Sequence, residues 1–256
     1  MTTPVFSIIM PAWNRAIDIP RAITSVQKQV FTDYELIIID DGSTDDLGSA
    51  VAPYLGNRIR LFRTPHRGVG AARNFGIQEA QGTYIAYLDS DNTWYPTFLS
   101  RMHAALASAK GGKYSAYCRF NQYNRLPFLH IPYRWRIKGE PFNFENLLVE
   151  NYIDINTFIH ARDCVAVSGS WDESLKRLVD WDFIIRVTAQ YPPLFVPEIL
   201  VNYYYKICEN SISSQEPLVP ALAAVREKIR RMPKRSKEPD PQKDLEDNYQ
   251  WNSHTR

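Results

Sequence analysis

Apolar runs and amphipathic segments alternate along the first part of the chain. Two runs that are apolar almost throughout, Val5–Met10 and Tyr34–Asp40, predict strands covered on both faces, as in a parallel sheet. A third such run begins at Thr83 and stops at Asp89. The run Arg58–Arg63 is more polar and predicts a strand near the edge of the sheet.

Helices are predicted between these strands. Asp18 is placed to cap the first helix, and Pro20 is tolerated in its first turn. Apolar residues then recur at helical spacing, at Ile19, Ile23, Val26 and Val30. A short helix follows Ser43, and another runs from Gly68 to about Ala80. This alternation, which continues to residue 109, predicts an α/β fold with a mostly parallel sheet and right-handed crossovers.

Polar or aromatic side chains directly follow three of the predicted strands. Trp13 comes after the first strand, Asp41 after the second, and Asp89 and Asp91 after the strand that begins at Thr83. Ligands of such sheets bind beyond the carboxyl ends of the strands. We therefore expect these residues to converge on one crevice although they lie far apart in sequence.

Asp89 and Asp91 stand one residue apart at the end of an apolar run. An unpaired buried charge is costly, so the pair indicates a cavity that holds a cation. Mg²⁺ and Mn²⁺ prefer oxygen ligands, and Mg²⁺ is commonly held by one or two carboxylates while substrate phosphates complete its shell. The pair therefore predicts a divalent cation that carries a phosphate. The alternative is an ordinary turn, because Asp, Ser and Asn also begin turns.

Gly68 and Gly70 open the helix that carries Arg73. The dinucleotide-binding pattern needs a third glycine at a set spacing directly after the first strand of its unit, and these glycines do not meet that requirement. We interpret them as a loop that lets the backbone pass close to a ligand. Arg73 then lies on the first turn of a helix whose amino end favours anions.

Beyond Tyr114 the alternation is less regular. The stretch Asn121–Glu145 is rich in aromatic, proline and basic residues, which is typical of a long covering loop, of a wall that binds an acceptor, or of a hydrophobic cluster under a loop. Leu178–Val187 predicts a helix that begins with Asp180, an acid that is either functional or only a partner of the helix dipole. One face of that helix is apolar at four-residue spacing, at Val179, Phe183 and Val187. One or two strands are predicted within Leu194–Tyr205.

From Pro217 the character of the chain changes. Val219–Met232 predicts a helix, and Arg226–Lys237 holds seven basic residues and one acid. Most charge runs are solvated faces. The alternative is peripheral contact with an anionic membrane surface, where each basic residue contributes about 1 kcal/mol. The last nineteen residues are polar and predict a frayed or disordered tail.

Length, composition and net charge limit the classes of protein to which this chain can belong. The 256 residues, 45% of them hydrophobic, suit one large α/β domain or two small ones. A net charge of +2 argues against nucleic acid as the partner. The cysteines Cys118, Cys164 and Cys208 are few and widely spaced, which is typical of a reducing compartment. Because we find no signal peptide or membrane-spanning run, we expect a cytoplasmic location, with the inner face of the membrane as the alternative.

Several of these motifs together resemble those of the family 2 glycosyltransferases. The resemblance covers about residues 5–213 and rests on five motifs in the family's order, namely Ser7–Arg15, Asp40–Ser43, Gly70–Asn74, Asp89–Asp91 and Val179–Asp182. It implies the GT-A fold, a Rossmann-like and mostly parallel sheet flanked by helices. It also implies a nucleotide-sugar-binding half at 1–110, an acceptor-binding and catalytic half of the same domain at 111–216, and a basic helix with a tail at 217–256.

The resemblance further implies an inverting, metal-dependent transfer of a sugar from a nucleotide diphosphate to a hydroxyl of a glycan or lipid-linked acceptor. The donor would be a UDP-sugar in preference to a GDP- or dTDP-sugar, and the cofactor Mn²⁺ or Mg²⁺. Asp180 matches the general base, and Asp91 and Asp89 match the metal-binding DxD motif. The nucleotide-sugar contacts that it implies are Pro11, Ala12, Trp13, Asn14, Arg15, Asp41, Arg73, Asp89 and Ser90.

Three positions depart from the family pattern. Val179 stands where relatives often have Glu, and Asn92 stands where a third acid is common. After Tyr205, Lys206 keeps the usual positive charge but Cys208 replaces a His. These departures keep a second hypothesis open, a nucleotide-sugar-binding protein without catalysis.

A third hypothesis concerns another enzyme class. Residues Asp89 to Thr93 satisfy the Asp-x-Asp-x-Thr pattern of the haloacid-dehalogenase-like phosphatases, in which the first Asp accepts the phosphoryl group. In those enzymes the motif ends the first strand of the domain, whereas here three strand-helix units precede it. The nucleotidyltransferases that make sugar nucleotides are disfavoured, because the first strand-helix turn lacks their glycine-rich loop.

Overall fold

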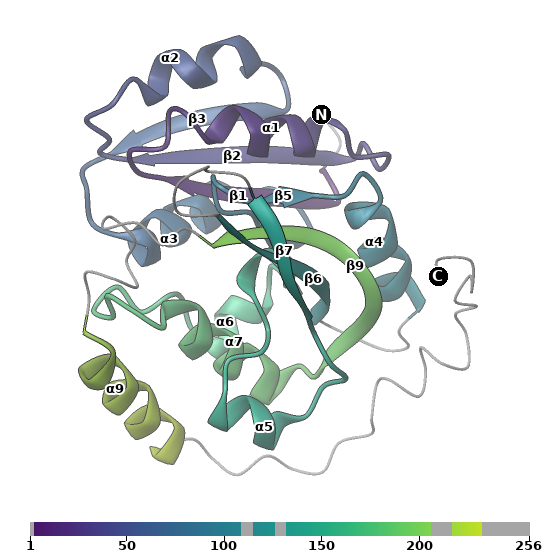
Figure 1. The fold of residues 1–256 in the computed structure, drawn as a ribbon, viewed down its shortest axis with the longest axis vertical. Helices are drawn as coiled ribbons and strands as arrows, with labels where there is room; N and C mark the ends of the chain where they lie inside the picture. Colours follow the sequence, from purple (N-terminus) through teal and green to yellow (C-terminus); the bar gives the residue numbers. More distant parts are fainter. Residues whose placement is uncertain (1–2, 109–114, 126–131, 206–216, 232–256) are drawn as a thin grey trace.

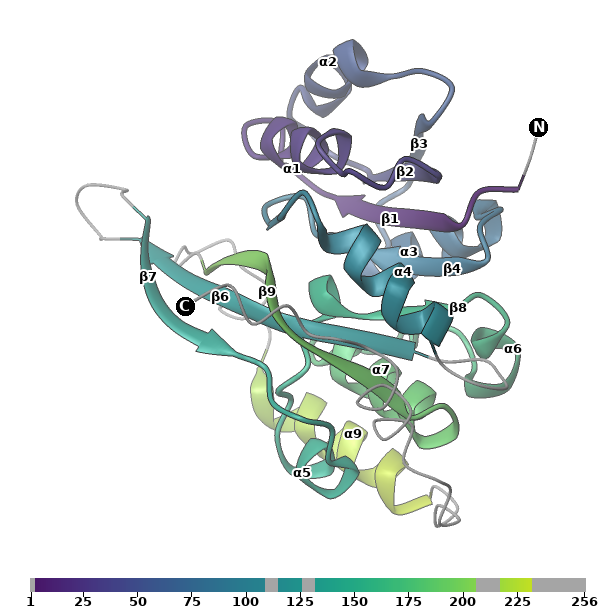
Figure 2. The same ribbon diagram turned by 90° about the vertical axis from the view of Figure 1, so that its right-hand side faces the viewer.

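The computed structural model describes residues 3–108, 115–125, 132–205 and 217–231. Four strands of its first half run parallel: β1 (Phe6–Ala12), β2 (Tyr34–Asp41), β3 (Ile59–Thr64) and β4 (Tyr84–Tyr87). Figure 1 labels the first three of them, and Figure 2 labels all four. The four strands lie in the order β3-β2-β1-β4, so the polar strand β3 forms an edge of the sheet, as predicted. The helices between and after them are α1 (Ile19–Gln27), α2 (Leu47–Val51), the short 3₁₀ helix η1 (Ala52–Tyr54), α3 (Val69–Glu79) and α4 (Phe98–Ser108).

Helices cover both faces of this parallel half, which is why β1 and β2 are mostly apolar. On one face, Ile8 and Met10 belong to a core that includes residues of α1, α2 and α4. On the other face, Ile9 and Ile37 belong to a second core with residues of α3 and of later helices. All seven residues of β1 and all eight of β2 are buried. Alternate side chains of one strand thus enter two different cores.

The second half of the chain extends the same sheet. Its strands are β6 (Ser115–Arg125), β7 (Pro132–Lys138), β8 (Ile159–Ala161) and β9 (Pro193–Tyr205), with the short β5 (Thr93–Trp94) at the far edge. β8 pairs antiparallel with β4 and with β6, and β6 pairs parallel with β9 (Figure 2). The sheet is therefore parallel in its first half and mixed in its second. The alternative of two late strands is resolved as the single strand β9.

The prediction of a loop over Asn121–Glu145 is wrong for residues 121–125 and 132–138, which form strands, whereas residues 139–143 connect β7 to the next helix without regular structure. β6 continues to Arg125, and β7 pairs antiparallel with it over Pro132–Lys138. Aromatic and β-branched residues favour a half-exposed strand, and Tyr133 and Ile137 of β7 are indeed exposed. Residues 126–131 lie outside the described part, and binding of an acceptor by this hairpin stays a prediction.

The remaining helices are α5 (Phe144–Val149), the 3₁₀ helix η2 (Ile155–Thr157), α6 (Cys164–Ser168), α7 (Val179–Gln190) and α9 (Leu218–Arg231). Of these, α5, α6, α7 and α9 lie below β1, β2 and β3 in Figure 1. The apolar face predicted for α7 is confirmed, because Val179, Phe183 and Val187 are buried. The predicted late helix is confirmed as α9, whereas the predicted tail lies outside the described residues. None of the helices in the described ranges is long and apolar enough to cross a bilayer.

Two predicted boundaries differ from the structure. β1 extends through Pro11 and Ala12, which were expected in a loop. Pairing with β4 ends at Ile9, so the missing N–H of Pro11 costs β1 no ladder hydrogen bond there. Helix α1 ends at Gln27, and Val30 is 63% exposed instead of facing the core. Asp18 occupies the N-cap position of α1, but its side chain makes no capping hydrogen bond.

Candidate functional site

The carboxyl ends of β1, β2 and β4 meet at one edge of the sheet. In the parallel register Ala12 lies beside Asp40, and Ile9 lies beside Tyr87. The residues that follow these strands therefore emerge side by side. This arrangement brings Trp13, Asp41 and the turn Asp89–Asp91 together from three separate parts of the chain. We call this turn the DxD turn.

The loop after β1 is tied to the loop after β2. Asn14 adopts a left-handed backbone conformation with φ 53°. Its Oδ1 accepts hydrogen bonds from the N–H groups of Thr44 and Asp45, at 2.8 and 3.3 Å. Trp13 is 39% exposed, and its ring stacks on His66 with ring centroids 4.6 Å apart. His66 thus supports one face of the Trp13 ring, at the edge of the sheet where the parallel strands end.

Asp41 holds the loop that leads into α3. Its two carboxylate oxygens accept hydrogen bonds from the backbone N–H groups of Arg67 and Gly68, both at 2.9 Å. Gly68 has φ 97°, a conformation that glycine adopts without strain. Asp41 is buried, so in this structure it shapes the entrance to α3. Its implied nucleotide contact stays a prediction.

Arg73 and Asp89 form a partly buried ion pair at the centre of the site. The Nη2 of Arg73 donates to Asp89 Oδ1 at 2.8 Å, and the guanidinium lies 4.5 Å from the ring centroid of Trp171. Arg73 is only 4% exposed, yet its Nε has no hydrogen-bond partner among the described residues. A buried donor without a partner calls for an explanation. A bound anion would supply one.

Asp91 lies closer to solvent than Arg73. Its carboxylate is 3.6 Å from the Nε of Arg15, and its backbone carbonyl accepts from Arg21 Nη2 at 2.7 Å. Ser90 between the two acids is buried. Asn92 fastens the turn to β9, because its Oδ1 accepts from the N–H of Tyr204 at 2.9 Å. Contacts with Arg15 and Arg21 and with β9 thus hold the DxD turn in place.

Asp180 is partly buried on the first turn of α7. Leu178, with φ 60°, turns the chain into this helix. Burial raises the pKa of Asp180, while the positive charge of Arg73 lowers that pKa and the negative charge of Asp89 raises it. Asn151 Nδ2 donates to Asp180 Oδ2 at 3.2 Å. Charges on Arg73 and Asp89 affect Asp180 in this way only if the groups lie close together.

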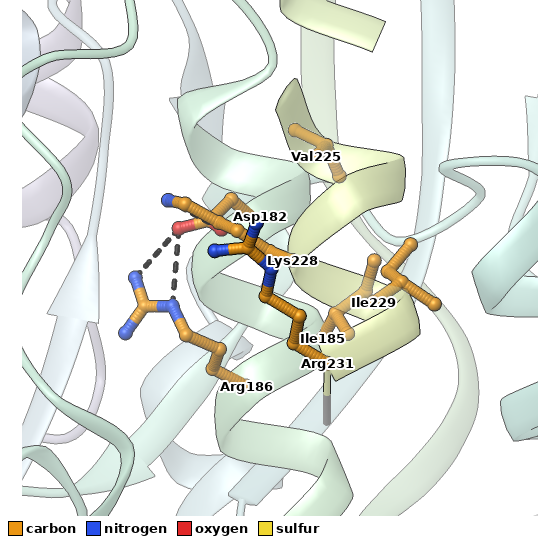
Figure 3. A pocket seen from close by; sticks show the side chains of 7 residues that line it. All are labelled: Asp182, Ile185, Arg186, Val225, Lys228, Ile229 and Arg231. Atoms are coloured by element: carbon orange, nitrogen blue, oxygen red, sulfur yellow. Dashed lines mark hydrogen bonds and ion pairs between the residues drawn. The ribbon is translucent and has the colours of Figure 1, made fainter. Parts of the chain in front are cut away.

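Asp182, the second acid of α7, is bound in a different network. Arg186 donates to its Oδ2 from Nη2 at 2.7 Å and from Nε at 3.1 Å, and Lys228 of α9 donates to its Oδ1 at 3.0 Å (Figure 3). Lys228 also pairs with Asp172. Asp182, Arg186 and Lys228 line part of a cavity of about 310 Å³ between α7 and α9. Asp182 is fully paired there, so Asp180 is the acid of this helix that faces the site.

Sequence reasoning missed three polar residues of the site. Asn151 contacts Asp180, and Asn156 donates to Asp89 Oδ2 at 3.1 Å. Asp154 accepts from Asn156 Nδ2 at 2.7 Å. The pKa of Asp154 is raised to about 7, first by burial and then by the charges of Asp89 and Asp180, which together outweigh the lowering effect of the hydrogen bonds from Asn156. The only signal in the sequence was that Asp154 and Asn156 flank one apolar residue shortly before the strand β8.

The donor atoms present fit a cation that shares its ligands with a substrate. Among the described residues, no group of three or more His, Cys, Asp or Glu side chains could hold a metal ion. Asp91 offers a partly exposed carboxylate, whereas both oxygens of Asp89 already have protein partners. Mg²⁺ typically takes one or two carboxylates and completes its shell with water and substrate phosphates. The site therefore suits an ion that arrives with a diphosphate.

Two of the predicted features lie wholly or partly outside the described residues. The segment with Lys206 and Cys208 is outside them, and so are residues 232–237 of the basic stretch. Within α9, Lys228 is paired with acids, and Arg230 and Arg231 both pair with Glu227. Contact of this stretch with a membrane stays a prediction.

Comparison with known proteins points to one family. The family described as Glycosyl transferase family 2 matches residues 7–171. A PGL/p-HBAD biosynthesis glycosyltransferase of Mycobacterium bovis is 30% identical over 211 residues, which are 81% of this chain and 76% of that protein.

Solved structures of S. aureus TarS 1–349 are similar in fold. The complex with UDP-GlcNAc has a TM-score of 0.70 at 18% identity, over 86% of this chain and 64% of that one. The complex with UDP has a TM-score of 0.64 at 18% identity, over 79% and 61%. This chain thus spans less than two thirds of the TarS fragment. The likeness confirms the predicted GT-A type of α/β fold.

Proposed function

Because this chain belongs to glycosyl transferase family 2 and is a glycosyltransferase, we propose that it moves a sugar from a nucleotide diphosphate to a hydroxyl of a glycan or lipid-linked acceptor. The proposal also includes inversion at the anomeric carbon, with Asp180 as the general base. Its phosphatase alternative is not supported, because the family is one of glycosyl transfer and Asp89 follows the fourth strand of the chain.

The donor is proposed to be a uridine diphosphate sugar. TarS, which has a similar fold, was crystallised with UDP-GlcNAc and with UDP. The strand end Pro11–Ala12 and the exposed ring of Trp13 would face the base and ribose, with Asn14 and Asp41 holding the two loops in place. The unpaired Nε of Arg73 suits a diphosphate oxygen, because charge-assisted hydrogen bonds to phosphate are strong.

The cofactor is proposed to be Mn²⁺ or Mg²⁺, with Asp91 as its principal protein ligand and Asp89 beside it. When bound, such an ion stabilises the negative charge that builds on the departing diphosphate. Arg15 lies 3.6 Å from Asp91 and balances its charge before the ion arrives. Arg73 contributes a second positive charge next to the phosphates.

Asp180 is proposed to remove the proton of the acceptor hydroxyl. As that proton passes to Asp180, the acceptor oxygen forms a bond to the anomeric carbon, and the bond from this carbon to the diphosphate oxygen breaks on the opposite face. Burial raises the pKa of Asp180 and makes it a stronger base than an ordinary carboxylate, while the positive charge of Arg73 lowers that pKa. The observation that carries the proposal is the shared environment of Asp180, Arg73 and Asp89. Helix α7 begins beside the start of α3, where a carbon added to Gly70 would lie 3.5 Å from Val179 Cγ1, and the charges of Arg73 and Asp89 act on Asp180.

The test is a transfer and hydrolysis assay with a panel of UDP-, GDP- and dTDP-sugars. We expect wild-type turnover that EDTA abolishes and Mn²⁺ or Mg²⁺ restores. Asp180→Asn should lower turnover by about 10²–10⁴-fold, the usual contribution of a general base, and leave nucleotide affinity unchanged. The matched control is Asp33→Asn, because the side chain of Asp33 is exposed and precedes β2, at the opposite end of that strand from Asp41.

Two outcomes would contradict the proposal. A wild-type chain that binds a nucleotide sugar but neither transfers nor hydrolyses it would support the non-catalytic binder. Phosphate release from phosphomonoesters that depends on Asp89 but not on Asp180 would support the phosphatase.

A further inference from the structure

A buried amide clamps the first acid of the DxD turn from a distant part of the chain. Asn156 of η2 is fully buried, and its side chain meets both the backbone and the side chain of Asp89. The Asp89 N–H donates to Asn156 Oδ1 at 2.7 Å, and Asn156 Nδ2 donates to Asp89 Oδ2 at 3.1 Å. Because Arg73 binds the other oxygen of Asp89 at 2.8 Å, the whole carboxylate is held.

Asp154 fixes the orientation of that amide. Its Oδ1 accepts from the backbone N–H of Asn156 at 2.9 Å and from Nδ2 at 2.7 Å. A flipped amide would turn its oxygen toward the carboxylates and its NH₂ toward the N–H of Asp89, so these bonds would be lost. Trp94 Nε1 donates a further hydrogen bond, at 2.8 Å, to the backbone carbonyl of Asn156. The amide therefore has one stable position.

The position of η2 makes this contact possible. β8, which begins at Ile159, pairs antiparallel with β4 and places Ile159 beside Ala86. The chain just before β8 therefore lies next to the chain just after β4, which is the DxD turn. The contact joins residues 67 positions apart in sequence.

We propose that Asp154 and Asn156 are positioning residues, which hold the Asp89 end of the DxD turn so that Asp91 meets the cation and diphosphate in a fixed place. This proposal rests on the proposed function. It assigns Asp154 the task of accepting two hydrogen bonds from Asn156. A neutral amide oxygen can do the same, so the negative charge of Asp154 is not needed for this task.

The test measures the affinity for a nucleoside diphosphate by calorimetry, with Mn²⁺ and with EDTA. The probe is whichever of UDP, GDP and dTDP binds the wild-type chain best. We call the ratio of the affinity measured with Mn²⁺ to the affinity measured with EDTA the metal-dependent gain. The variants are Asn156→Ala, Asp154→Ala and Asp154→Asn. The matched control is Asn121→Ala, because Asn121 is also a buried amide but bonds to Asn202, at 3.1 Å, instead of to the turn.

We expect Asn156→Ala and Asp154→Ala to lower the metal-dependent gain by about tenfold or more, as loss of groups that orient metal ligands commonly does. Asp154→Asn should stay within about threefold of the wild-type gain, since its Oδ1 can accept the same two hydrogen bonds. Affinity in EDTA should be the same in every variant, and Asn121→Ala should match wild type. If Asn156→Ala does not fold, the two Asp154 variants still decide the question.

Three results would overturn the proposal. Equal losses in Asp154→Asn and Asp154→Ala would mean that the charge of Asp154 acts on the ligand directly. A wild-type gain in Asn156→Ala would mean that the amide does not place the turn. A loss that is the same with Mn²⁺ and with EDTA would indicate a general fold defect. A wild-type chain that binds none of the three nucleotides would instead overturn the proposed function.

Discussion

His160, on β8 behind the candidate site, should make stability depend on pH. It is fully buried, its Nε2 accepts from Tyr87 Oη at 2.9 Å, and its Nδ1 donates to the carbonyl of Ala161 at 2.8 Å. Tyr87 Oη in turn accepts from Trp171 Nε1 at 3.3 Å. This network suits a neutral imidazole, because a second proton, on Nε2, would remove the acceptor of the Tyr87 hydroxyl. Replacement by glutamine removes the titration and keeps an acceptor for Tyr87.

The size of the effect follows from the pKa of His160, which burial lowers from 6.5 to about 4. Between these two values the unfolded chain binds more protons than the folded chain. The unfolding free energy is therefore highest above pH 6.5 and falls as pH decreases through this window. This difference in proton binding lowers the unfolding free energy by about 2 kcal/mol at about pH 5 and by about 3 kcal/mol at about pH 4.

The assay is urea unfolding of wild type and His160→Gln at several pH values between about 7.5 and about 4. The difference between the two chains isolates His160, because other groups titrate in both. Asp154 is such a group, and its raised pKa acts in the opposite direction, adding stability as pH falls. Wild type should lose more stability than the variant by the amounts given. Parallel profiles for the two chains would refute the argument that the buried imidazole resists protonation.

Two further predictions concern the charge on Arg73 and the packing of a glycine. Arg73→Met should move the acid limb of the pH profile of kcat to higher pH, because the charge of Arg73 lowers the pKa of Asp180. Arg67→Met is the control, since Arg67 is an exposed residue paired with Glu173. An acid limb of Arg73→Met that stays in place or moves to lower pH would contradict the shared environment of Arg73 and Asp180. Gly82→Ala should destabilise the fold by about 1–3 kcal/mol through overpacking, since its Cβ would lie 2.5 Å from the backbone nitrogen of Ser7. Gly56→Ala is the control, because no atom lies within 4 Å of its added carbon. Equal urea midpoints for the two glycine variants would show that the contact between position 82 and Ser7 is relieved at no cost in stability.

The parallel half of the fold could be predicted because burial on both faces leaves a visible trace. The runs at β1 and β2 are apolar at every position that enters a core, and the acids of the DxD turn stand out at the end of such a run. Composition was ambiguous for the β6 and β7 hairpin, because exposed aromatic and basic residues suit a loop as well as an edge strand. The structure decides for strands through the pairing of β7 with β6.

The site itself could be predicted only where chemistry coincides with a strand end. Asn156 touches Asp89 through the antiparallel approach of β8 to β4, and no local pattern encodes that pairing. The two acids of α7 could likewise not be told apart by position. Asp182 is neutralised by Arg186 and by Lys228, which lies 46 residues later, and this pairing leaves Asp180 as the acid at the site.

The most direct measurement is a crystal structure of Asp180→Asn with Mn²⁺ and the nucleotide sugar that binds best. We expect the ion to bind at Asp91, the diphosphate to lie beside Arg73, and the side chain at position 180 to lie on the opposite face of the sugar. That side chain should reach a hydroxyl placed about 3 Å from the anomeric carbon. An ion bound away from Asp91, or a sugar that position 180 cannot reach, would contradict the account.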